Sequence, residues 1–281
     1  MNPIDALRDG GIASPRELVR GRNIWQGYYG DKHEPVVLKG VRPGMTEQSI
    51  RREADIADTI ACHPRNLEME LQRANGLWVI PSYGIIETKV GPYFTTPRFL
   101  PLSAAIDSSY SSTAVLSFLV HASDAVAAVH RADKYYNDVK PENFVLKSLS
   151  DAKPILIDFG TVSNRAPGAH LGVHGTPGFA SPQQLAGICD PGADVFGLGA
   201  SAYHLLTGQH ATPRKTACRE NSIKEYSLAP AKLTLVSANF ADLPTSAYKL
   251  VDAMLEPASK NRPRLIEVRS AALASLGEIS Q

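Results

Sequence analysis

The feature that most constrains this chain is the stretch 136–160, which reads YNDVKPENFVLKSLSDAKPILIDFG. Asp138, Lys140 and Asn143 stand close together in it, and Asp158 follows a short apolar run. Phosphoryl transfer to a hydroxyl needs a carboxylate to accept the hydroxyl proton, a cation against the phosphoryl charge and oxygen ligands for Mg²⁺. Asp138 and Lys140 supply the first two groups. Asn143 and Asp158 are candidate metal ligands, so the stretch predicts a site rather than a solvated loop.

The same stretch resembles the catalytic loop, the following strands and the DFG motif of the eukaryotic-type protein kinases. The family's usual His-Arg before the catalytic aspartate is here Tyr136-Asn137. The chain therefore resembles a divergent, non-RD member of the Ser/Thr protein kinase type. The resemblance implies ATP and Mg²⁺ as cofactors, and a Ser or Thr hydroxyl of a protein substrate as the acceptor. Tyr136 is expected to fill a core position under the catalytic loop.

Length and composition fit one domain of this family. The chain has 281 residues, enough for a two-lobed domain with a real core. Its formal net charge of +1 favours neither nucleic acid nor an anionic membrane as a partner. The resemblance implies a single domain over residues 1–281 with a bilobal α+β fold. Its small antiparallel N-lobe, at about 15–97, would include the family's helix αC, and the C-lobe at about 98–281 would be α-helical.

The three cysteines do not form a recognisable site. Cys62, Cys189 and Cys218 are odd in number, widely separated and without a CxxC pair, which argues against a disulfide framework and a structural zinc site. The N-terminus has no apolar core of signal-peptide length, and we expect that no run elsewhere approaches the roughly 20 apolar residues of a membrane span. We expect a reducing, cytoplasmic setting. The sequence leaves open export by an uncleaved signal and delivery into another cell.

The N-terminal part supplies a candidate nucleotide-binding lysine. Residues 21–40 have the aromatic and β-branched content of strands, and the last of these, Val-Val-Leu-Lys, resembles the family's V-A-I-K. The resemblance places Lys39 at the ATP phosphates and Val37 beside the nucleotide. As a strand lysine aimed into a cleft, Lys39 is expected to contribute little to stability. A helix is predicted over 45–62, and Glu53 on it resembles the family's partner for that lysine.

The family's glycine-rich loop is degenerate in this chain. In GRNIWQGY only Gly21 stands where a glycine is expected, and Asn23 and Gln26 replace the other two. Glycines there let backbone N–H groups approach phosphates closely, and Asn tolerates positive φ better than Gln does. Gly21 is therefore the one nucleotide-binding candidate in this loop.

Further predictions concern a helix start, two strands, a hinge and one residue of the C-terminal half. Ser14-Pro15-Arg16-Glu17 has the pattern of a helix start. Two antiparallel strands are predicted over 78–86 and 93–96. The resemblance makes Thr96 the gatekeeper, makes 97–99 the hinge and places Val145 at the nucleotide.

The C-terminal half carries the segment GTPGFASPQ, which resembles GTPxYxAPE. The resemblance implies that Thr176 contacts the catalytic aspartate and lysine. Gln183 replaces the glutamate that pairs with a distant arginine, here Arg262, so a weaker neutral hydrogen bond is expected there. Asp194 resembles the aspartate that bonds to the catalytic-loop backbone.

Two features that the family uses for regulation by phosphorylation are missing from this sequence. Asn137 has no charge to offer a phosphorylated residue, and 164–175 contains no Ser, Thr or Tyr. We therefore expect that activity does not depend on activation-loop phosphorylation.

Three function classes fit the sequence: an active Ser/Thr protein kinase, a pseudokinase that acts as a scaffold or nucleotide-binding module, and a small-molecule kinase of the same fold. Lys140 and GTPGFASPQ argue against the third class, because they belong to the machinery that seats a peptide. Retention of the candidate lysine, acids and amide favours the first class over the second.

Overall fold

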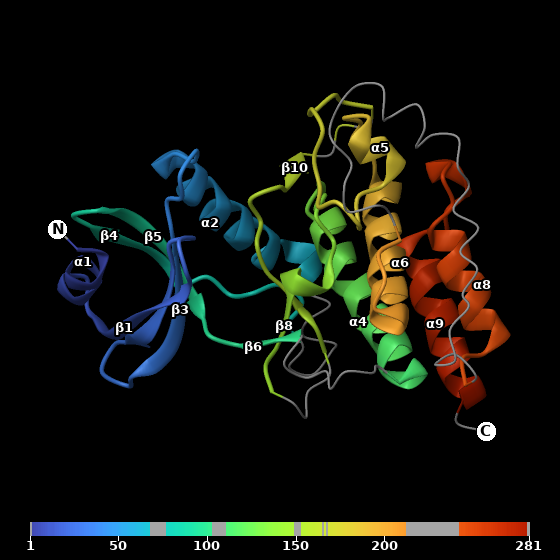
Figure 1. Cartoon of the computed structure of the whole chain (residues 1–281), viewed down its shortest axis with the longest axis horizontal. Coiled ribbons are helices and arrows are strands. Elements are labelled where there is room, and N and C mark those ends of the chain that lie inside the picture. Colours follow the sequence, from blue (N-terminus) through green and yellow to red (C-terminus); the bar gives the residue numbers. More distant parts are fainter. Residues whose placement is uncertain are drawn as a thin grey trace. The chain divides into compact units, whose positions relative to one another are not determined.

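The computed structural model describes residues 2–67, 77–102, 111–148, 153–164, 166, 168–211 and 242–279. The chain divides into two compact units (Figure 1). Unit 1 comprises Met1–Phe99 with Asp158–Gly160, and unit 2 comprises Leu100–Ile157 with Thr161–Gln281. The first is built on a β-sheet and the second mainly on helices, which confirms the predicted α+β class.

Unit 1 contains a five-stranded antiparallel sheet. In spatial order its strands are β1 (Ile12–Val19), β2 (Ile24–Tyr29), β3 (Glu34–Gly40), β5 (Gly91–Pro97) and β4 (Gly84–Thr88). The helix α2 (Glu47–Ala61) packs against β5 and β4 and begins at Thr46, whose hydroxyl accepts a hydrogen bond from the Ser49 N–H. The strands predicted within 21–40 and the helix predicted over 45–62 are thus confirmed.

The predicted helix start at Ser14 is wrong. Residues 14–17 lie in β1, and the helix α1 (Pro3–Asp9) comes earlier, with Asn2 as its N-cap and Pro3 at its first position. Both sites fit the local capping pattern. Pairing with β2, in which Arg16 lies opposite Gln26, decides in favour of a strand. The strand predicted over 78–86 likewise begins only at Gly84.

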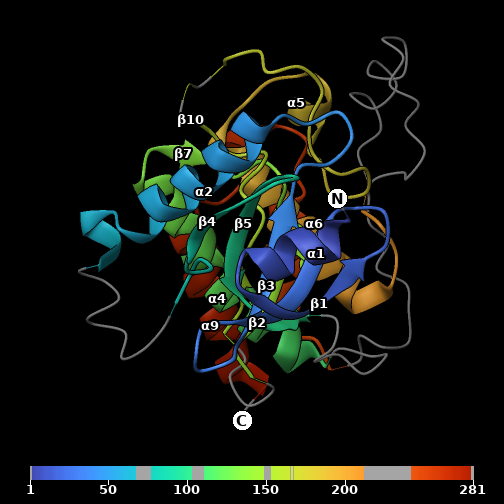
Figure 2. The same ribbon diagram turned by 90° about the vertical axis from the view of Figure 1, so that its left-hand side faces the viewer.

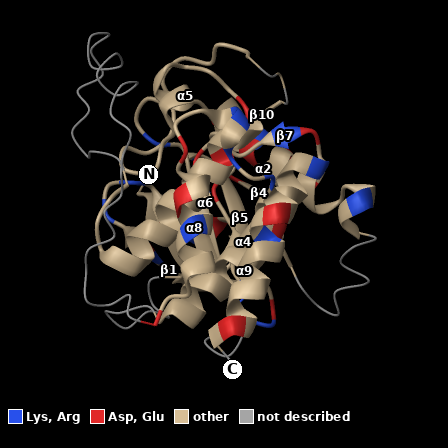
Figure 3. Ribbon diagram, turned by 90° about the vertical axis from the view of Figure 1, so that its right-hand side faces the viewer, with Lys and Arg blue, Asp and Glu red and all other residues tan. Residues whose placement is uncertain are grey.

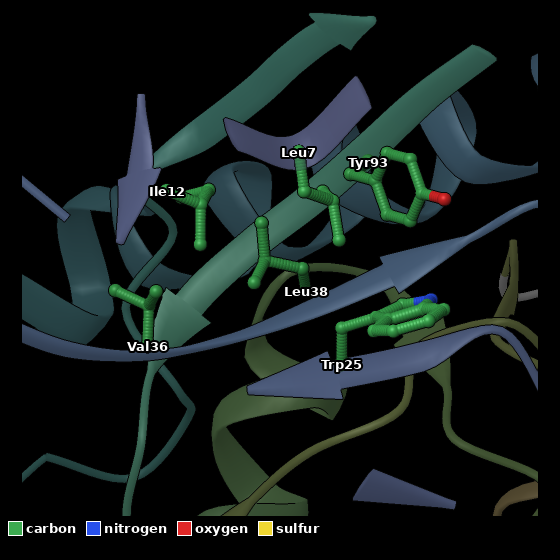
Figure 4. Close-up of a cluster of buried hydrophobic side chains, with 6 residues drawn as sticks. All are labelled: Leu7, Ile12, Trp25, Val36, Leu38 and Tyr93. Carbon is green, nitrogen blue, oxygen red and sulfur yellow. The ribbon is translucent and has the colours of Figure 1, made fainter. Parts of the chain in front are cut away.

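The two faces of the sheet are used differently. Side chains alternate along a strand, so Val36 and Leu38 of β3 project to one face and Val37 and Lys39 to the other. Figure 2 shows α1 in front of the sheet strands. The first face carries a buried cluster (Figure 4) formed by Leu7, Ile12, Trp25, Val36, Leu38 and Tyr93. The second face, which carries Val37 and Lys39, does not take part in this cluster.

Unit 2 is a helical assembly with two small sheets. Its helices are α4 (Ser112–Arg131), α5 (Pro182–Leu185), α6 (Pro191–Thr207), α8 (Thr245–Met254) and α9 (Leu265–Ile279). One sheet holds β6 (Leu100–Pro101), β8 (Phe144–Leu146) and β9 (Ile155–Leu156), and the other β7 (Lys134–Tyr135) and β10 (Ser163–Asn164). The 3₁₀ turns are η2 (Pro141–Asn143) and η4 (Ser259–Asn261). Figure 3 shows both signs of charge on the described elements in view, in keeping with a net charge near zero.

The helix α4 has the length and composition of a membrane span, so the prediction that no run approaches one is wrong. About two thirds of its apolar window (67%) is buried inside the protein. It packs against α6 and α9. Its apolar character is therefore accounted for by its place in the core of unit 2.

The core of unit 1 yields a stability prediction. We expect Leu7→Ala to lower the free energy of unfolding by roughly 2–4 kcal/mol, because Leu7 is fully buried and its truncation leaves a cavity. Leu18→Ala is the matched control, since Leu18 is 44% exposed. Urea unfolding of both variants measures the difference. Equal losses would contradict a core role for α1.

Candidate functional site

The predicted site residues of unit 1 meet at Lys39. Its Nζ donates to Oε1 of Glu53 at 2.7 Å and to Oδ1 of Asp158 at 2.8 Å. The backbone N–H of Phe159 also donates to Glu53 Oε1, at 3.2 Å. The structure thus brings together a strand lysine, a helix glutamate and an aspartate from a distant part of the sequence.

Two members of this ion-pair cluster are shielded from water, whereas the Asp158 side chain is 38% exposed. Lys39 is 9% exposed and Glu53 1% exposed. Burial raises the pKa of Glu53 above its ordinary value, against the opposing attraction of the Lys39 ammonium. Burial would also raise the pKa of Asp158, but the Lys39 ammonium outweighs it and lowers the pKa of Asp158 below its usual value. The cluster therefore favours an ionised Asp158.

The other residues predicted at the nucleotide lie in both units. Val37 pairs with Thr96 across β3 and β5, on the face that also carries Lys39. Gly21 occupies the turn between β1 and β2 with φ +71°, a conformation that favours glycine. Val145 lies in β8, in unit 2, and is buried.

Asn23 has a structural role that the sequence did not reveal. Its Nδ2 donates to the Val41 carbonyl at 2.8 Å, and its Oδ1 accepts from Trp25 Nε1 at 2.7 Å and Tyr93 Oη at 3.1 Å. The side-chain amide is thus occupied within the fold. A Cβ on Gly40 would lie 2.4 Å from Asn23 Nδ2, so this arrangement requires glycine there.

In unit 2, Asp138 is the centre of a hydrogen-bond network. Its Oδ1 accepts from Thr176 Oγ1 at 2.6 Å, and its Oδ2 accepts from Lys140 Nζ at 2.7 Å. Lys140 also donates to Thr176 Oγ1 at 2.6 Å. Asn143 Nδ2 donates to the Asp138 carbonyl at 2.8 Å and to Oδ2 at 3.2 Å. Of the polar residues predicted here from the sequence, Lys140, Asn143 and Thr176 thus all contact Asp138.

The backbone just before Asp138 is held by Asp194. Asp194 Oδ2 accepts from the Tyr136 N–H at 2.9 Å, and Oδ1 accepts from the Asn137 N–H at 2.7 Å. His130 Nε2 also contacts Oδ2, at 2.8 Å. The predicted bond between Asp194 and the loop backbone is confirmed. Tyr136 is fully buried, and its hydroxyl donates to the Ile157 carbonyl, which fits the expected core position.

The side chain of Asn137 links the catalytic loop to the segment after Gly160. Its Nδ2 donates to the Thr161 carbonyl and to Ser163 Oγ, both at 3.0 Å. Cys189 Sγ contacts its Oδ1 at 3.5 Å and Ser163 Oγ at 3.3 Å, and burial raises the pKa of the Cys189 thiol. No local pattern indicates these contacts, because the partners are far apart in the sequence.

The expected bond between Gln183 and Arg262 is present. Arg262 Nη2 donates to Gln183 Oε1 at 2.8 Å. The guanidinium also donates to the carbonyls of Glu256, Gly192 and Pro257. Burial lowers the pKa of Arg262 to about 10, so it remains charged at neutral pH. The family pattern has a glutamate carboxylate at the position of Gln183. Here the neutral Gln183 amide and three backbone carbonyls accept the hydrogen bonds of the Arg262 guanidinium.

Comparison with known families matches residues 73–272 to the protein kinase domain. The match includes the residues around Asp138 and begins after Lys39 and Glu53. The chain is 30% identical over 159 residues to the serine/threonine-protein kinase PknA of Nostoc sp., covering 52% of this chain and 28% of that protein.

Two further relatives are also serine/threonine-protein kinases that the chain matches over only part of their length. The chain is 38% identical over 99 residues to serine/threonine-protein kinase PknL of Mycobacterium tuberculosis, covering 34% of this chain and 24% of the relative. It is 28% identical over 179 residues to serine/threonine-protein kinase fused of Drosophila melanogaster, covering 62% and 20%. The aligned stretch thus spans less than a third of the length of each of these three relatives.

The burial of Lys39 changes what its removal should do. Instead of the small effect expected for a strand lysine in a cleft, we expect Lys39→Met to lower the free energy of unfolding by roughly 3 kcal/mol. The substitution leaves the buried Glu53 beside Asp158 without its cation. Urea unfolding measures the loss, and the double variant with Glu53→Gln should recover much of it.

The same variant has a pH signature. Loss of the ammonium raises the pKa of Glu53 further above its unfolded value of about 4.3, so stability is lost as pH rises through the folded pKa. The deficit relative to wild type should be larger at about pH 8 than at about pH 5. A deficit that is the same at both values would contradict this account.

Proposed function

We propose that this chain, which belongs to the protein kinase domain family, transfers the γ-phosphate of ATP to serine or threonine hydroxyls of a protein substrate. The hydrogen-bonded set around Asp138 carries the proposal. The names of the relatives, all serine/threonine-protein kinases, support the choice of acceptor.

The geometry of unit 2 suits a base for an acceptor hydroxyl. Thr176, Lys140 and Asn143 all donate to Asp138, which fixes the direction of the carboxylate. An attacking hydroxyl that replaces one of these donors can pass its proton to Asp138. Lys140 then lies where it can offset negative charge on the transferred phosphoryl group.

The geometry of unit 1 suits the phosphates of a nucleotide. Glu53 holds the Lys39 ammonium on the face of the sheet that also carries Val37, where it can contact two phosphate groups. In this unit Asp158 would supply a carboxylate, a hard ligand of the kind that Mg²⁺ takes. Asn143, in unit 2, carries an amide oxygen, which is also a ligand type suited to Mg²⁺. The metal would supply positive charge to offset the charge of the phosphates.

We further propose that transfer does not require phosphorylation of the segment after Gly160. Asn137 binds Thr161 and Ser163 by neutral hydrogen bonds, so this part of the segment is ordered without a phosphate. Farther along, the Leu171 N–H donates to the Gly187 carbonyl at 2.9 Å, and Cys189 N–H donates to Ala169. These bonds replace the charged pair that a phosphorylated residue would make.

A nucleotide-binding scaffold without transfer is the second candidate. The observation that favours it is the turn between β1 and β2, where Asn23 is committed to the fold and Gly21 is the one glycine. A small-molecule kinase is disfavoured by the contact between Lys140 and Thr176, which places the GTPGF segment against the base. Measured transfer separates the first two candidates.

Substitution of the two aspartates should separate transfer from binding. We expect Asp138→Asn and Asp158→Asn each to lower phosphorylation of a generic protein acceptor by roughly 100-fold or more, since one removes the base and the other a metal ligand. Of the two, Asp158→Asn should greatly weaken Mg²⁺-dependent ATP binding. Initial rates and equilibrium titration with ATP measure these effects.

Asp133→Asn is the matched control, because Asp133 is exposed and the charge change is the same. It should behave like wild type. Near-wild-type transfer by Asp138→Asn would exclude the proposed mechanism.

The ordering of the segment after Gly160 should depend on the side chain of Asn137 and not on a phosphorylated residue. We expect Asn137→Ala to lower the initial rate by roughly tenfold, because two neutral hydrogen bonds to the segment are lost. Treatment of the wild-type protein with a broad phosphatase should leave the rate unchanged. Ser163→Ala is a weaker test, since Ser163 also bonds to Asn137.

Asn164→Ala serves as the control, because Asn164 is exposed and bonds only to Lys134 among the described residues. A drop of about tenfold or more after phosphatase treatment would mean that a phosphorylated residue orders the segment.

A further inference from the structure

The residue directly before the candidate base has an uncommon backbone conformation. Asn137 has φ +69°, in the left-handed region that residues other than glycine seldom adopt. A residue keeps such a conformation when the surrounding structure holds it there. The Asn137 N–H donates to Asp194 Oδ1 on α6 at 2.7 Å. The Asn137 carbonyl belongs to the peptide group that leads into Asp138, so its partner bears directly on the base.

That partner is a glutamine on the short helix α5. Gln184 Nε2 donates to the Asn137 carbonyl oxygen, and both residues are buried. Gly175, the neighbour of Thr176, covers this bond, because a Cβ there would lie only 3.1 Å from Gln184 Nε2. Asn137 is thus held at its N–H from α6 and at its carbonyl from α5.

The other end of the Gln184 amide begins the helix α5. Its Oε1 accepts from the Ser181 N–H at 3.0 Å, and the Gln184 N–H donates to Ser181 Oγ at 3.2 Å. These two bonds form a capping box, in which glutamate serves as well as glutamine. Capping therefore does not call for an amide. What the amide adds is the Nε2 donor, which a carboxylate lacks.

We propose that Gln184 is a positioning residue for the base Asp138, acting through the carbonyl of Asn137. This inference rests on the proposed function and assigns to α5 a part in it. Without the Nε2 donor, the left-handed conformation of Asn137 is less constrained, and the backbone that carries Asp138 changes direction. A base works only within hydrogen-bond reach of the proton that it takes. Loss of the donor therefore lowers the rate of transfer and leaves ATP binding intact.

Gln184→Glu separates positioning from capping. The variant keeps an acceptor for the Ser181 N–H but sets a carboxylate oxygen against the Asn137 carbonyl. We expect kcat for transfer to a generic protein acceptor to fall roughly 30-fold at about pH 8, with KM for ATP within about twofold of wild type. Protonation of the introduced carboxyl restores a donor, and burial raises its pKa. The deficit should therefore shrink to roughly threefold at about pH 6.

Gln184→Leu removes the donor in a form that no proton can restore. We expect a roughly tenfold lower kcat, with the same deficit relative to wild type at about pH 8 and about pH 6. Ser275→Ala is the control within unit 2. It removes a buried hydroxyl that bonds to Ser246 Oγ at 2.7 Å, and it should leave kcat unchanged.

Hydrogen exchange gives a readout that does not need transfer. The backbone amides of residues 136–138 should exchange faster in Gln184→Leu than in wild type or Ser275→Ala. Equal exchange rates would overturn the inference. So would wild-type kcat in Gln184→Glu at about pH 8, or a deficit of that variant that does not shrink at about pH 6. Wild-type protein that transfers no phosphate would refute the proposed function, and the exchange rates would still decide whether Gln184 holds the loop.

Discussion

Unit 2 depends on a carboxylate that is almost removed from water, since Asp194 is only 1% exposed. A buried charge is costly unless its oxygens are hydrogen bonded. Here both oxygens accept a backbone N–H, one from Tyr136 and one from Asn137, and His130 adds a third contact. These bonds fix the two residues that directly precede Asp138. The base candidate therefore takes its position from the helix α6, on which Asp194 lies.

The same helix supports the loop by close packing. A Cβ at Gly197 would lie 2.8 Å from the Cβ of Val139, so glycine lets the loop rest directly on α6. With its backbone N–H held by Asp194, Asn137 is free to use its side chain on Thr161 and Ser163. Loop and segment are thereby joined by neutral bonds. This supports the proposal that transfer needs no phosphorylated residue, because no charge has to be supplied to complete the connection.

In unit 1, the alternation of side chains along β3 places apolar and charged residues on opposite faces of the sheet. One face of β3 contributes Val36 and Leu38 to a core that α1 helps to bury, and the other presents Val37 and Lys39. The separation allows an ion-pair cluster to lie one residue away from a hydrophobic core. The side chain of Gln26 likewise lies on the face that carries Lys39 and not in that core.

The sequence by itself determined the parts of the protein that depend on short spacing. The interval from Asp138 to Asn143 identified a candidate site. Helical periodicity identified the helix that carries Glu53, and aromatic and β-branched content identified the strand that carries Lys39, because both are local properties of the sequence. The sequence did not distinguish the capping pattern at Ser14 from the one at Asn2, since both satisfy the same local rule.

Only the tertiary structure decided which polar groups are buried and which partners they have. Pairing with β2 made Ser14 part of a strand, and packing far along the chain gave Asn137 its partners at Thr161 and Ser163. Folding also buried Lys39 between two carboxylates, Glu53 and Asp158. The sequence alone showed Gln26 only as a replacement for a glycine of the family's loop. The pairing of β2 with β3 places Gln26 in the sheet, where its Oε1 is buried and has no hydrogen-bond partner among the described residues. Burial and hydrogen bonding depend on residues that are distant in sequence and close in space.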